Sequence, residues 1–240
     1  MINVTPEALI RDLIVVIIVM LSASLHEVAH GWVAYKCGDN TAKEQGRLTL
    51  NPLAHLDVFG SLILPFCMML MGGPVFGYAK PVPYNPYRLR NRRVDELLVA
   101  LAGPASNLIQ VLLGAVVLFV IGHMVPTSFR ALLATSAQFS FSTSPLNWVV
   151  QILNLYIWAN LILCFFNLIP LPPLDGSHII AFFLKGRALQ TYYQISRYSL
   201  PILIVVLYVF PMMFHVSPLG WYFDVTASAV YEGILRVCFV

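Results

Sequence analysis

Hydrophobic residues in this chain are grouped in long stretches rather than in the short alternations that are typical of a soluble fold. Four of these stretches approach or exceed the roughly 20 helical residues that a hydrocarbon core requires. They cover residues 13–35, 97–124, 148–169 and 198–214. A fifth stretch, 58–79, is free of charge but contains Pro65 and Pro74, which interrupt a regular helix. We therefore predict an all-α polytopic membrane protein with about four to six transmembrane helices.

Composition supports the membrane assignment and excludes some other classes. Hydrophobic residues make up 59% of the 240 residues and charged residues only 10%, and the mean hydropathy is +0.78. The formal net charge of +3 is too small to indicate a nucleic-acid surface, so we expect no nucleic-acid partner. The four cysteines have no paired spacing, which argues against a disulfide framework or a thiolate metal site. No part of the chain offers room for a second unit, and residues 1–240 are predicted to form a single domain.

The first apolar stretch contains the sequence HEVAH, so that His26, Glu27 and His30 lie where lipid-facing residues are expected. Residues four apart share one face of a helix, so both imidazoles can reach one ion, with Glu27 beside them. In this arrangement zinc lowers the pKa of its water to about 7 and the glutamate takes the proton. The alternative is that each histidine is a polar residue satisfied between helices. A charge at the centre of a membrane helix costs roughly 2.5–3.5 kcal/mol, which disfavours that alternative for three ionisable groups on one turn.

A third zinc ligand must come from elsewhere, because a catalytic zinc keeps three protein ligands and one open position. Asp175 is the strongest candidate, since it follows the stretch 148–169 in a segment whose prolines prevent a regular helix. Irregular backbone at membrane depth is tolerated where it is buried in protein or lines a wet cavity. The alternative is that Asp175 is the N-cap of a following helix at the membrane interface.

Three motifs, HEVAH, ALAGPASN and FNLIPLPPLDGSH, together resemble the site-2 protease family of intramembrane zinc metallopeptidases. They run through residues 26–178, and the chain is most similar to the short bacterial branch that has neither a PDZ nor a CBS domain. The resemblance implies one Zn²⁺ per chain, held by His26, His30 and Asp175. It implies that Glu27 is the catalytic base.

The same resemblance implies a substrate and residues that hold it. The expected reaction is hydrolysis of peptide bonds within a transmembrane helix of another membrane protein, and Asn167 is expected to help hold the substrate strand. Beyond the resemblance, we hypothesise that the turn that begins at Pro170 holds the same strand. Residues Gly103, Pro104 and Asn107 match the middle motif, where we expect close helix packing. A divalent-metal transporter and a catalytically inactive membrane scaffold are the alternative functions.

The metal site constrains how the chain crosses the membrane. His30 and Asp175 can share an ion only if the stretch 58–79 returns to the side from which it starts, so we predict a re-entrant or short helical segment there. Most of the 14 lysines and arginines then lie on one side, which the positive-inside rule makes cytosolic. The expected location is the cell (inner) membrane, with the active site toward the cytosol.

The roles of several further residues and segments are left open by the sequence. His55 and Asp57 are candidates either for alternative zinc ligands or for groups that hydrogen-bond to the metal-binding histidines, and His178 is a candidate for the second role. An interfacial position explains each of the three as well. The proline-rich stretch 78–87 is expected to be extended, either as part of the substrate path or as a plain connector. Residues 219–240 form either a last span or an interfacial helix, and the oligomeric state is left open.

Overall fold

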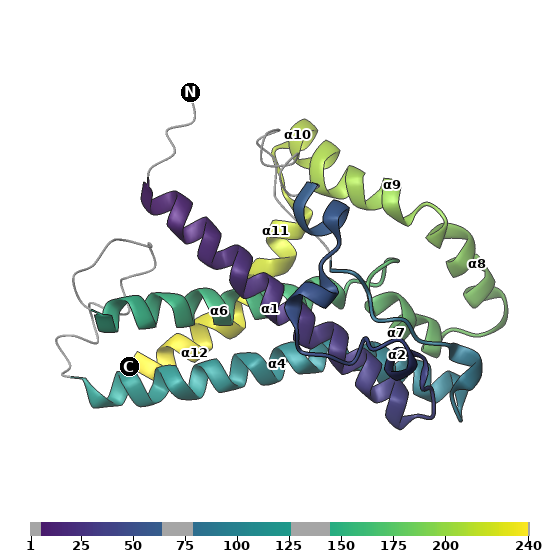
Figure 1. Cartoon of the computed structure of the whole chain (residues 1–240). Helices are drawn as coiled ribbons and strands as arrows, with labels where there is room; N and C mark the ends of the chain where they lie inside the picture. The colour runs from purple at the N-terminus through teal and green to yellow at the C-terminus, as the bar shows by residue number, and fades with distance from the viewer. Residues whose placement is uncertain (1–5, 64–78, 126–144, 240) are drawn as a thin grey trace.

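The computed structural model describes residues 6–63, 79–125 and 145–239, and every regular element within these ranges is helical (Figure 1). The predicted all-α class is therefore confirmed. The helices are α1 Pro6–Lys36, α2 Thr41–Glu44, η1 Pro52–His55, η2 Val58–Ile63, η3 Pro86–Arg88, α4 Arg92–Met124, α6 Pro145–Asn167, α7 Gly176–Phe183, α8 Gly186–Ser196, α9 Ser199–Ile204, η4 Val205–Val209, α10 Phe210–Phe214, α11 Pro218–Phe223, η5 Asp224–Ser228 and α12 Ala229–Phe239. Most of the predicted re-entrant stretch, residues 64–78, lies outside the described residues.

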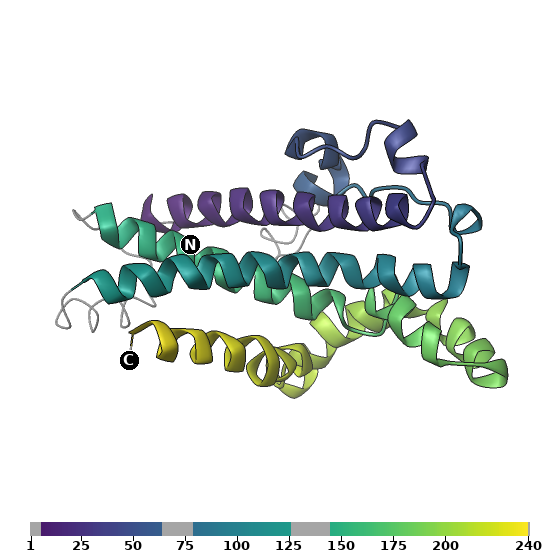
Figure 2. The same cartoon turned by 90° about the horizontal axis from the view of Figure 1, so that it is seen from below.

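Three long apolar helices, α1, α4 and α6, form the centre of the fold, and α4 lies beside both of the others (Figure 2). Among the described residues, these are the helices that are individually long and apolar enough to cross a membrane. A fourth span arises if α8 and the run from Pro201 to Phe214, which meet at an angle of 64°, are counted as one. This stretch is less regular than the sequence pattern suggests, because Pro201 has no N–H to donate to the carbonyl of Arg197.

Apolar side chains fill the space between α4, α6 and the C-terminal helices, with Leu118, Ile157 and Leu161 fully buried. Small residues allow these helices to approach closely. Gly122 lies directly against the carbonyl of Cys238, so no side chain would fit there. The C-terminal run therefore packs along α4 (Figure 2), and of the two alternatives for residues 219–240 the structure favours a helix that is part of the bundle.

The chain between α1 and α4 leaves and returns at the same end of the bundle. The N–H of Arg90 donates a hydrogen bond of 3.1 Å to the carbonyl of Cys37, the residue after α1. Helix α4 begins there because the Asn91 side chain accepts a hydrogen bond from the N–H of Val94, while Asp95 accepts one from the N–H of Asn91. The return that the sequence analysis predicts for this segment is thus present.

The described part of the proline-rich stretch is extended over residues 79–85, and η3 then turns the chain at Pro86. The stretch that we expect to be extended near 78–87 thus ends in a short helical turn, because Asn85 caps this turn by accepting a hydrogen bond from the N–H of Tyr87. Arg47 holds the segment in place, with its Nη2 donating to the carbonyls of Lys80 at 2.9 Å and Pro81 at 3.3 Å.

Candidate metal centre

Two histidines on one face of α1 point into the interior of the bundle. His26 is 6% exposed and His30 9% exposed, and their Nε2 atoms are 3.0 Å apart. The helical spacing of four residues produces this pairing directly, as the sequence pattern predicts. Two imidazole nitrogens that converge in a buried position can serve as ligands of one metal ion.

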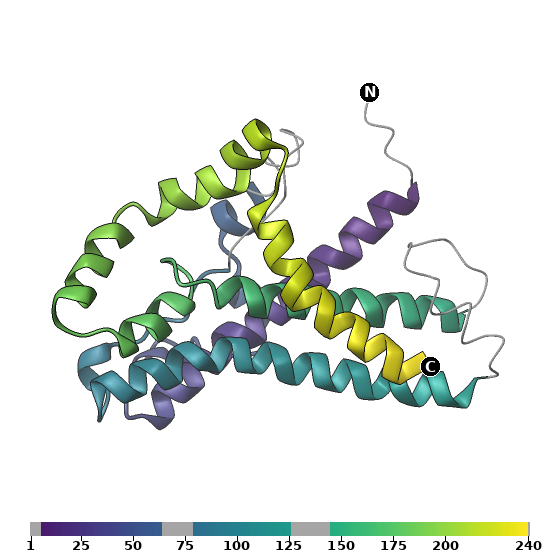
Figure 3. The same cartoon turned by 180° about the vertical axis from the view of Figure 1, so that it is seen from behind.

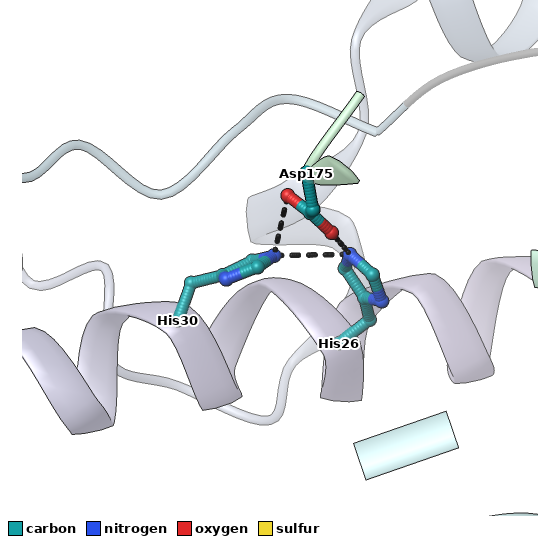
Figure 4. A group of neighbouring side chains, drawn as sticks. All are labelled: His26, His30 and Asp175. Carbon is teal, nitrogen blue, oxygen red and sulfur yellow. Dashed lines mark hydrogen bonds and ion pairs between the residues drawn. The ribbon is translucent and has the colours of Figure 1, made fainter. Parts of the chain in front are cut away.

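Asp175 joins this pair from a segment far away in the sequence (Figure 4). Its Oδ2 lies 3.1 Å from His26 Nε2 and its Oδ1 lies 3.3 Å from His30 Nε2. Asp175 also immediately precedes α7, but its side chain makes no capping hydrogen bond. Of the two sequence-based alternatives, the structure therefore favours a group that faces the histidines over a simple N-cap.

The turns between α6 and α7 bring Asp175 to the histidines. After α6 ends at Asn167, the backbone folds through short turns, and Gly176 packs directly against the carbonyls of Leu168 and Ile169. A Cβ at Gly176 would lie 2.5 Å from the oxygen of Ile169, so no other residue would fit without moving the backbone. The Asp-Gly pair thus combines a candidate ligand with the close approach that positions it.

Helix α4 fixes the orientation of both imidazoles. His26 Nδ1 donates to Asn107 Oδ1 at 2.9 Å, and His30 Nδ1 donates to the backbone carbonyl of Val99 at 2.6 Å. Because each Nδ1 carries a hydrogen in these contacts, the Nε2 atoms of neutral imidazoles present lone pairs to one another. Such an outer hydrogen bond commonly orients a histidine that binds a metal.

The atoms at the centre of this group form a set that requires a positive charge between them. The two Nε2 lone pairs face each other and the carboxylate of Asp175, and its buried Oδ2 has no hydrogen-bond partner. Acceptors that face acceptors repel each other unless a cation lies among them. Ligands about 2.0–2.1 Å from one ion at tetrahedral angles are roughly 3.3 Å apart, which matches the separations observed here. The residues therefore fit a tetrahedral ion such as zinc.

Gly103 of α4 lines the same site. A Cβ built on Gly103 would lie 2.5 Å from His26 Nε2 and even closer to His30 Nε2. The position therefore admits only a glycine if the two ring nitrogens are to keep their places. Close helix packing is expected at this motif, and here the backbone of α4 at Gly103 lies directly against the face of α1 that carries His26 and His30.

Glu27 is held beside the group by the extended segment. Its Oε2 accepts a hydrogen bond of 2.8 Å from the N–H of Val82, while the Val82 side chain is buried against Gly31. Since Pro81 and Pro83 have no N–H, Val82 carries the sole backbone donor of this triplet. The contact leaves Glu27 Oε1 available to another partner.

The remaining predicted site residues lie in several places. Asn167 donates from Nδ2 to the carbonyl of Leu163 at 3.0 Å, and the carbonyl of exposed Pro170 accepts from the hydroxyl of Tyr192 at 3.3 Å. His55 is buried with its Nε2 2.8 Å from the carbonyl of Thr49. Asp57 accepts from the N–H of Gly60, and His178 is exposed on α7.

The hydrogen-bond acceptors of the two metal-binding histidines are thus Asn107 and Val99, rather than His55, Asp57 or His178. The physical reason is that α4 packs against the inner face of α1, so that its groups meet the ring edges first. Sequence reasoning assigned Asn107 a packing role, and a buried amide in the same motif as Gly103 was the available signal. The contribution of Val99 has no such signal, because it comes from a backbone carbonyl.

A buried His-His-Asp group inside a bundle of long apolar helices, with a glutamate beside it, defines a membrane-embedded metalloenzyme. Comparison with known proteins makes the assignment specific. Peptidase family M50 matches residues 14–209, and the chain belongs to this family, that of the site-2 proteases. The predicted resemblance is thereby confirmed, and so is the assignment to a family of zinc metallopeptidases.

The chain is similar to bacterial proteins over most of its length. It is 39% identical over 207 residues to the "Putative zinc metalloprotease YwhC" of Bacillus subtilis, a match that covers 86% of this chain and 84% of the relative. It is 26% identical to the "Putative zinc metalloprotease Rip2" of Mycolicibacterium smegmatis, over 88% of this chain and 73% of the relative. The Rip2 of Mycobacterium tuberculosis (strain H37Rv) is 27% identical, over 86% and 68% of the two chains. No solved structure matches the chain.

Proposed function

We propose that this peptidase is an intramembrane zinc metalloprotease that hydrolyses peptide bonds within the transmembrane segments of other membrane proteins. The observation that carries the proposal is the position of the two histidines of the His-His-Asp group on a long apolar helix. His26 and His30 belong to the 27-residue part of α1, Ile10–Lys36, that is able to cross a membrane, and their neighbour Asn107 belongs to α4, another such helix. A substrate that reaches these residues has to enter the bundle from the lipid.

His26, His30 and Asp175 are the proposed ligands of one zinc ion. Two imidazole nitrogens and one carboxylate oxygen form a donor set that zinc prefers at catalytic sites, where a fourth position stays open. The names of the relatives agree with this choice of metal. A zinc ion of charge +2 is balanced by the carboxylates of Asp175 and Glu27, which limits the cost of burying the charges.

Glu27 is the proposed general base. When bound, zinc supplies a Lewis acid that polarises the scissile carbonyl and makes water acidic enough to react near neutral pH. Oε1 of Glu27 takes the proton of the attacking water and passes it to the nitrogen of the leaving amine. Oε2 stays on the N–H of Val82, which fixes the direction in which the carboxylate points.

The substrate has to unwind before it can react, because a helix hides its carbonyls in its own hydrogen bonds. The extended segment 79–85 offers backbone groups to which an unwound strand can add. Asn167 and the turn at Pro170 lie at the exit of α6, just before Asp175, and we propose that they hold the other side of the strand. To do so, the Asn167 amide exchanges its present bond to the carbonyl of Leu163 for one to the substrate.

The end of the bundle next to the site is proposed to face the cytosol. The end of α1, the beginning of α4 and helix α8 lie at this end (Figure 2). Basic residues gather there: Lys36, Lys43, Arg88, Arg90, Arg92, Arg93, Lys185 and Arg187. Such an accumulation next to membrane helices is typical of the cytosolic side, so the proposed location is the cell membrane with the site toward the cytosol.

The decisive experiment compares the wild-type protein with Glu27→Gln on a single-span membrane substrate, with Glu44→Gln as the matched control. Glu44 forms an exposed ion pair with Arg88 at 2.8 Å, so the same chemical change there leaves the site untouched. We expect Glu27→Gln to lower the cleavage rate by about 10²–10⁴-fold at unchanged zinc content. The membrane proteome of cells with this variant should contain the uncleaved substrate.

Two results would contradict the proposal. Cleavage by zinc-loaded Glu27→Gln at the normal rate would exclude Glu27 as the base. Undiminished zinc content in Asp175→Ala would exclude Asp175 as a ligand. A zinc ion that exchanges freely in the wild-type protein would point to a transport path instead of a catalytic centre.

A further inference from the structure

A cavity of about 400 Å³ lies outside the metal centre, where α4 begins and where α7 continues into α8. Figure 3 shows these three elements gathered at one end of the bundle. The lining residues are Arg92, Arg93, Glu96, His178, Ala181, Phe182, Leu184, Lys185, Gly186, Leu189 and Tyr193. The proposed peptidase reaction uses none of them.

The polar side of this cavity is cationic. Three basic side chains line it against one carboxylate, that of Glu96, which accepts a hydrogen bond of 3.0 Å from Nε of Arg92. Arg93 is held by its hydrogen bond to the carbonyl of Phe182, at 2.6 Å from Nη2. Lys185 is exposed and forms no hydrogen bond or ion pair with any residue that the structure describes. An unneutralised positive charge therefore faces the cavity.

The other side of the cavity is apolar and lies at the end of the candidate membrane span of α4, which begins at Arg92. Phe182, Leu184 and Leu189 contribute hydrocarbon and aromatic surface to the lining. Phe183, the residue after Phe182, is 66% exposed, which is costly in water but favourable against lipid. Cationic and apolar surface thus meet within one cavity at the end of the membrane-spanning helices.

We propose that this cavity binds an anionic phospholipid, with the phosphate group near Lys185 and Arg93 and the beginning of the acyl chains against the apolar side. A basic pocket at the ends of membrane helices has the charge to select anionic over zwitterionic head groups. A soluble phosphate compound would match the cations but would leave the apolar side in water. The combination of the two surfaces therefore assigns a lipid.

The position of the cavity links it to the metal centre. His178 lines the cavity and lies in the first turn of α7, the helix that Asp175 immediately precedes. Arg93 of α4 is bound to Phe182 near the end of the same helix. A head group between α4 and α8 therefore holds α7 in the place from which it presents Asp175.

The test counts lipids that stay bound to the purified full-length protein in an uncharged detergent, by native mass spectrometry. Phosphatidylglycerol and phosphatidylcholine with identical acyl chains are added at equal concentration, and soluble glycerol phosphate is added in a separate arm. We expect phosphatidylglycerol to be retained preferentially, and Lys185→Gln to reduce this preference about fivefold, as the loss of one cation at an anionic lipid predicts. Lys185→Arg should restore it.

The matched control is Arg197→Gln, which removes the same charge from an exposed position at the C-terminal end of α8, outside the lining. This variant should retain phosphatidylglycerol like the wild-type protein. Equal retention of the two lipids, or an equal loss in Arg197→Gln, would overturn the proposal. Displacement of the lipid by glycerol phosphate at equal concentration would identify a soluble phosphate ligand and would overturn the lipid assignment.

Discussion

The N–H of Val82 donates a hydrogen bond of 2.8 Å to the carboxylate of Glu27, which joins the extended segment to the metal-binding face of α1. The two residues are brought together by Arg47, whose guanidinium binds the carbonyls of Lys80 and Pro81 just before Val82. A carboxylate with one oxygen fixed by a backbone donor has a defined direction for the other oxygen.

Replacing Val82 by proline removes the donor and should lower kcat roughly hundredfold, because a misplaced base loses the alignment that proton transfer needs. Zinc content should stay at the wild-type level. The comparison is Val82→Ala, which keeps the N–H and loses only the side chain that is buried against Gly31. If the alanine variant loses as much activity as the proline variant, the packing and not the hydrogen bond positions Glu27.

Asn107→Leu should weaken zinc binding about 10- to 100-fold, since His26 then loses the acceptor that orients its ring. Asn107→Asp, which keeps an acceptor oxygen, should bind zinc far better than the leucine variant. The measurement is a competition titration against a chelator. Asn160→Leu serves as the control, because Asn160 is equally buried but donates to Ser22 instead of contacting a histidine. Wild-type zinc affinity in Asn107→Leu would refute the role of the amide.

Gly103→Ala should abolish zinc binding although alanine is the better helix former. In an open helical position this change stabilises a helix by about 0.5–1 kcal/mol, but here the new Cβ would occupy the space of the two Nε2 atoms. Gly233→Ala on α12, where nothing lies within 4 Å of the new atom, is the matched comparison. A Gly103→Ala protein with normal zinc content and normal cleavage would show that the helices can move apart at low cost.

Asp39 provides a prediction about pH outside the membrane helices. Burial alone would raise the pKa of its carboxyl, but hydrogen bonds from Thr41 and from the N–H of Asn85 outweigh this and hold the pKa below its ordinary value. A lowered pKa stabilises the fold above the ordinary aspartate value near 3.9, and the stabilisation is lost as the pH falls through the lowered pKa.

We therefore expect Asp39→Asn to lower the stability by about 1.5–3 kcal/mol near pH 7, as the loss of hydrogen bonds to a buried charge predicts. The difference from the wild-type protein should shrink as the pH falls below the ordinary aspartate pKa. Thermal unfolding of both proteins over pH 3–7 measures this. A difference in Tm that is constant over that range would mean that the charge of Asp39 does not contribute.

The sequence predicts the parts of the site that depend on local periodicity. The spacing of His26 and His30 fixes their common face without knowledge of the fold, and the proline-broken LPPLDG segment marks Asp175 as unusual for a membrane chain. The prediction that Asp175 lies beside His26 and His30 follows from the need of a catalytic zinc ion for three protein ligands. The same need predicts that the chain between α1 and α4 returns to the side from which it starts, and the hydrogen bond between Cys37 and Arg90 agrees with this prediction.

The remaining contacts depend on how α1 and α4 are rotated and shifted against each other, which the sequence does not reveal. Asn107 reaches His26, and Val99 reaches His30, because of that register. The bond between Val82 and Glu27 is an intermediate case. The absence of other N–H donors in Pro81-Val82-Pro83 indicates a specific partner for Val82, but the identity of that partner requires the structure.

The hydrogen bond between Arg90 and Cys37 makes the intervening chain a loop whose two ends lie together at one end of the bundle. A loop with adjacent ends can become longer or shorter without a change in the direction of the helices that follow it. A chain that instead returned at the other end of α1 would reverse the direction of α4 and α6 and would carry Asp175 to the opposite end of the bundle from His30. Changes in length are therefore tolerated best in parts of this loop away from Arg47, Val82 and Asn85, whose contacts hold it against α1 and the residues that follow α1.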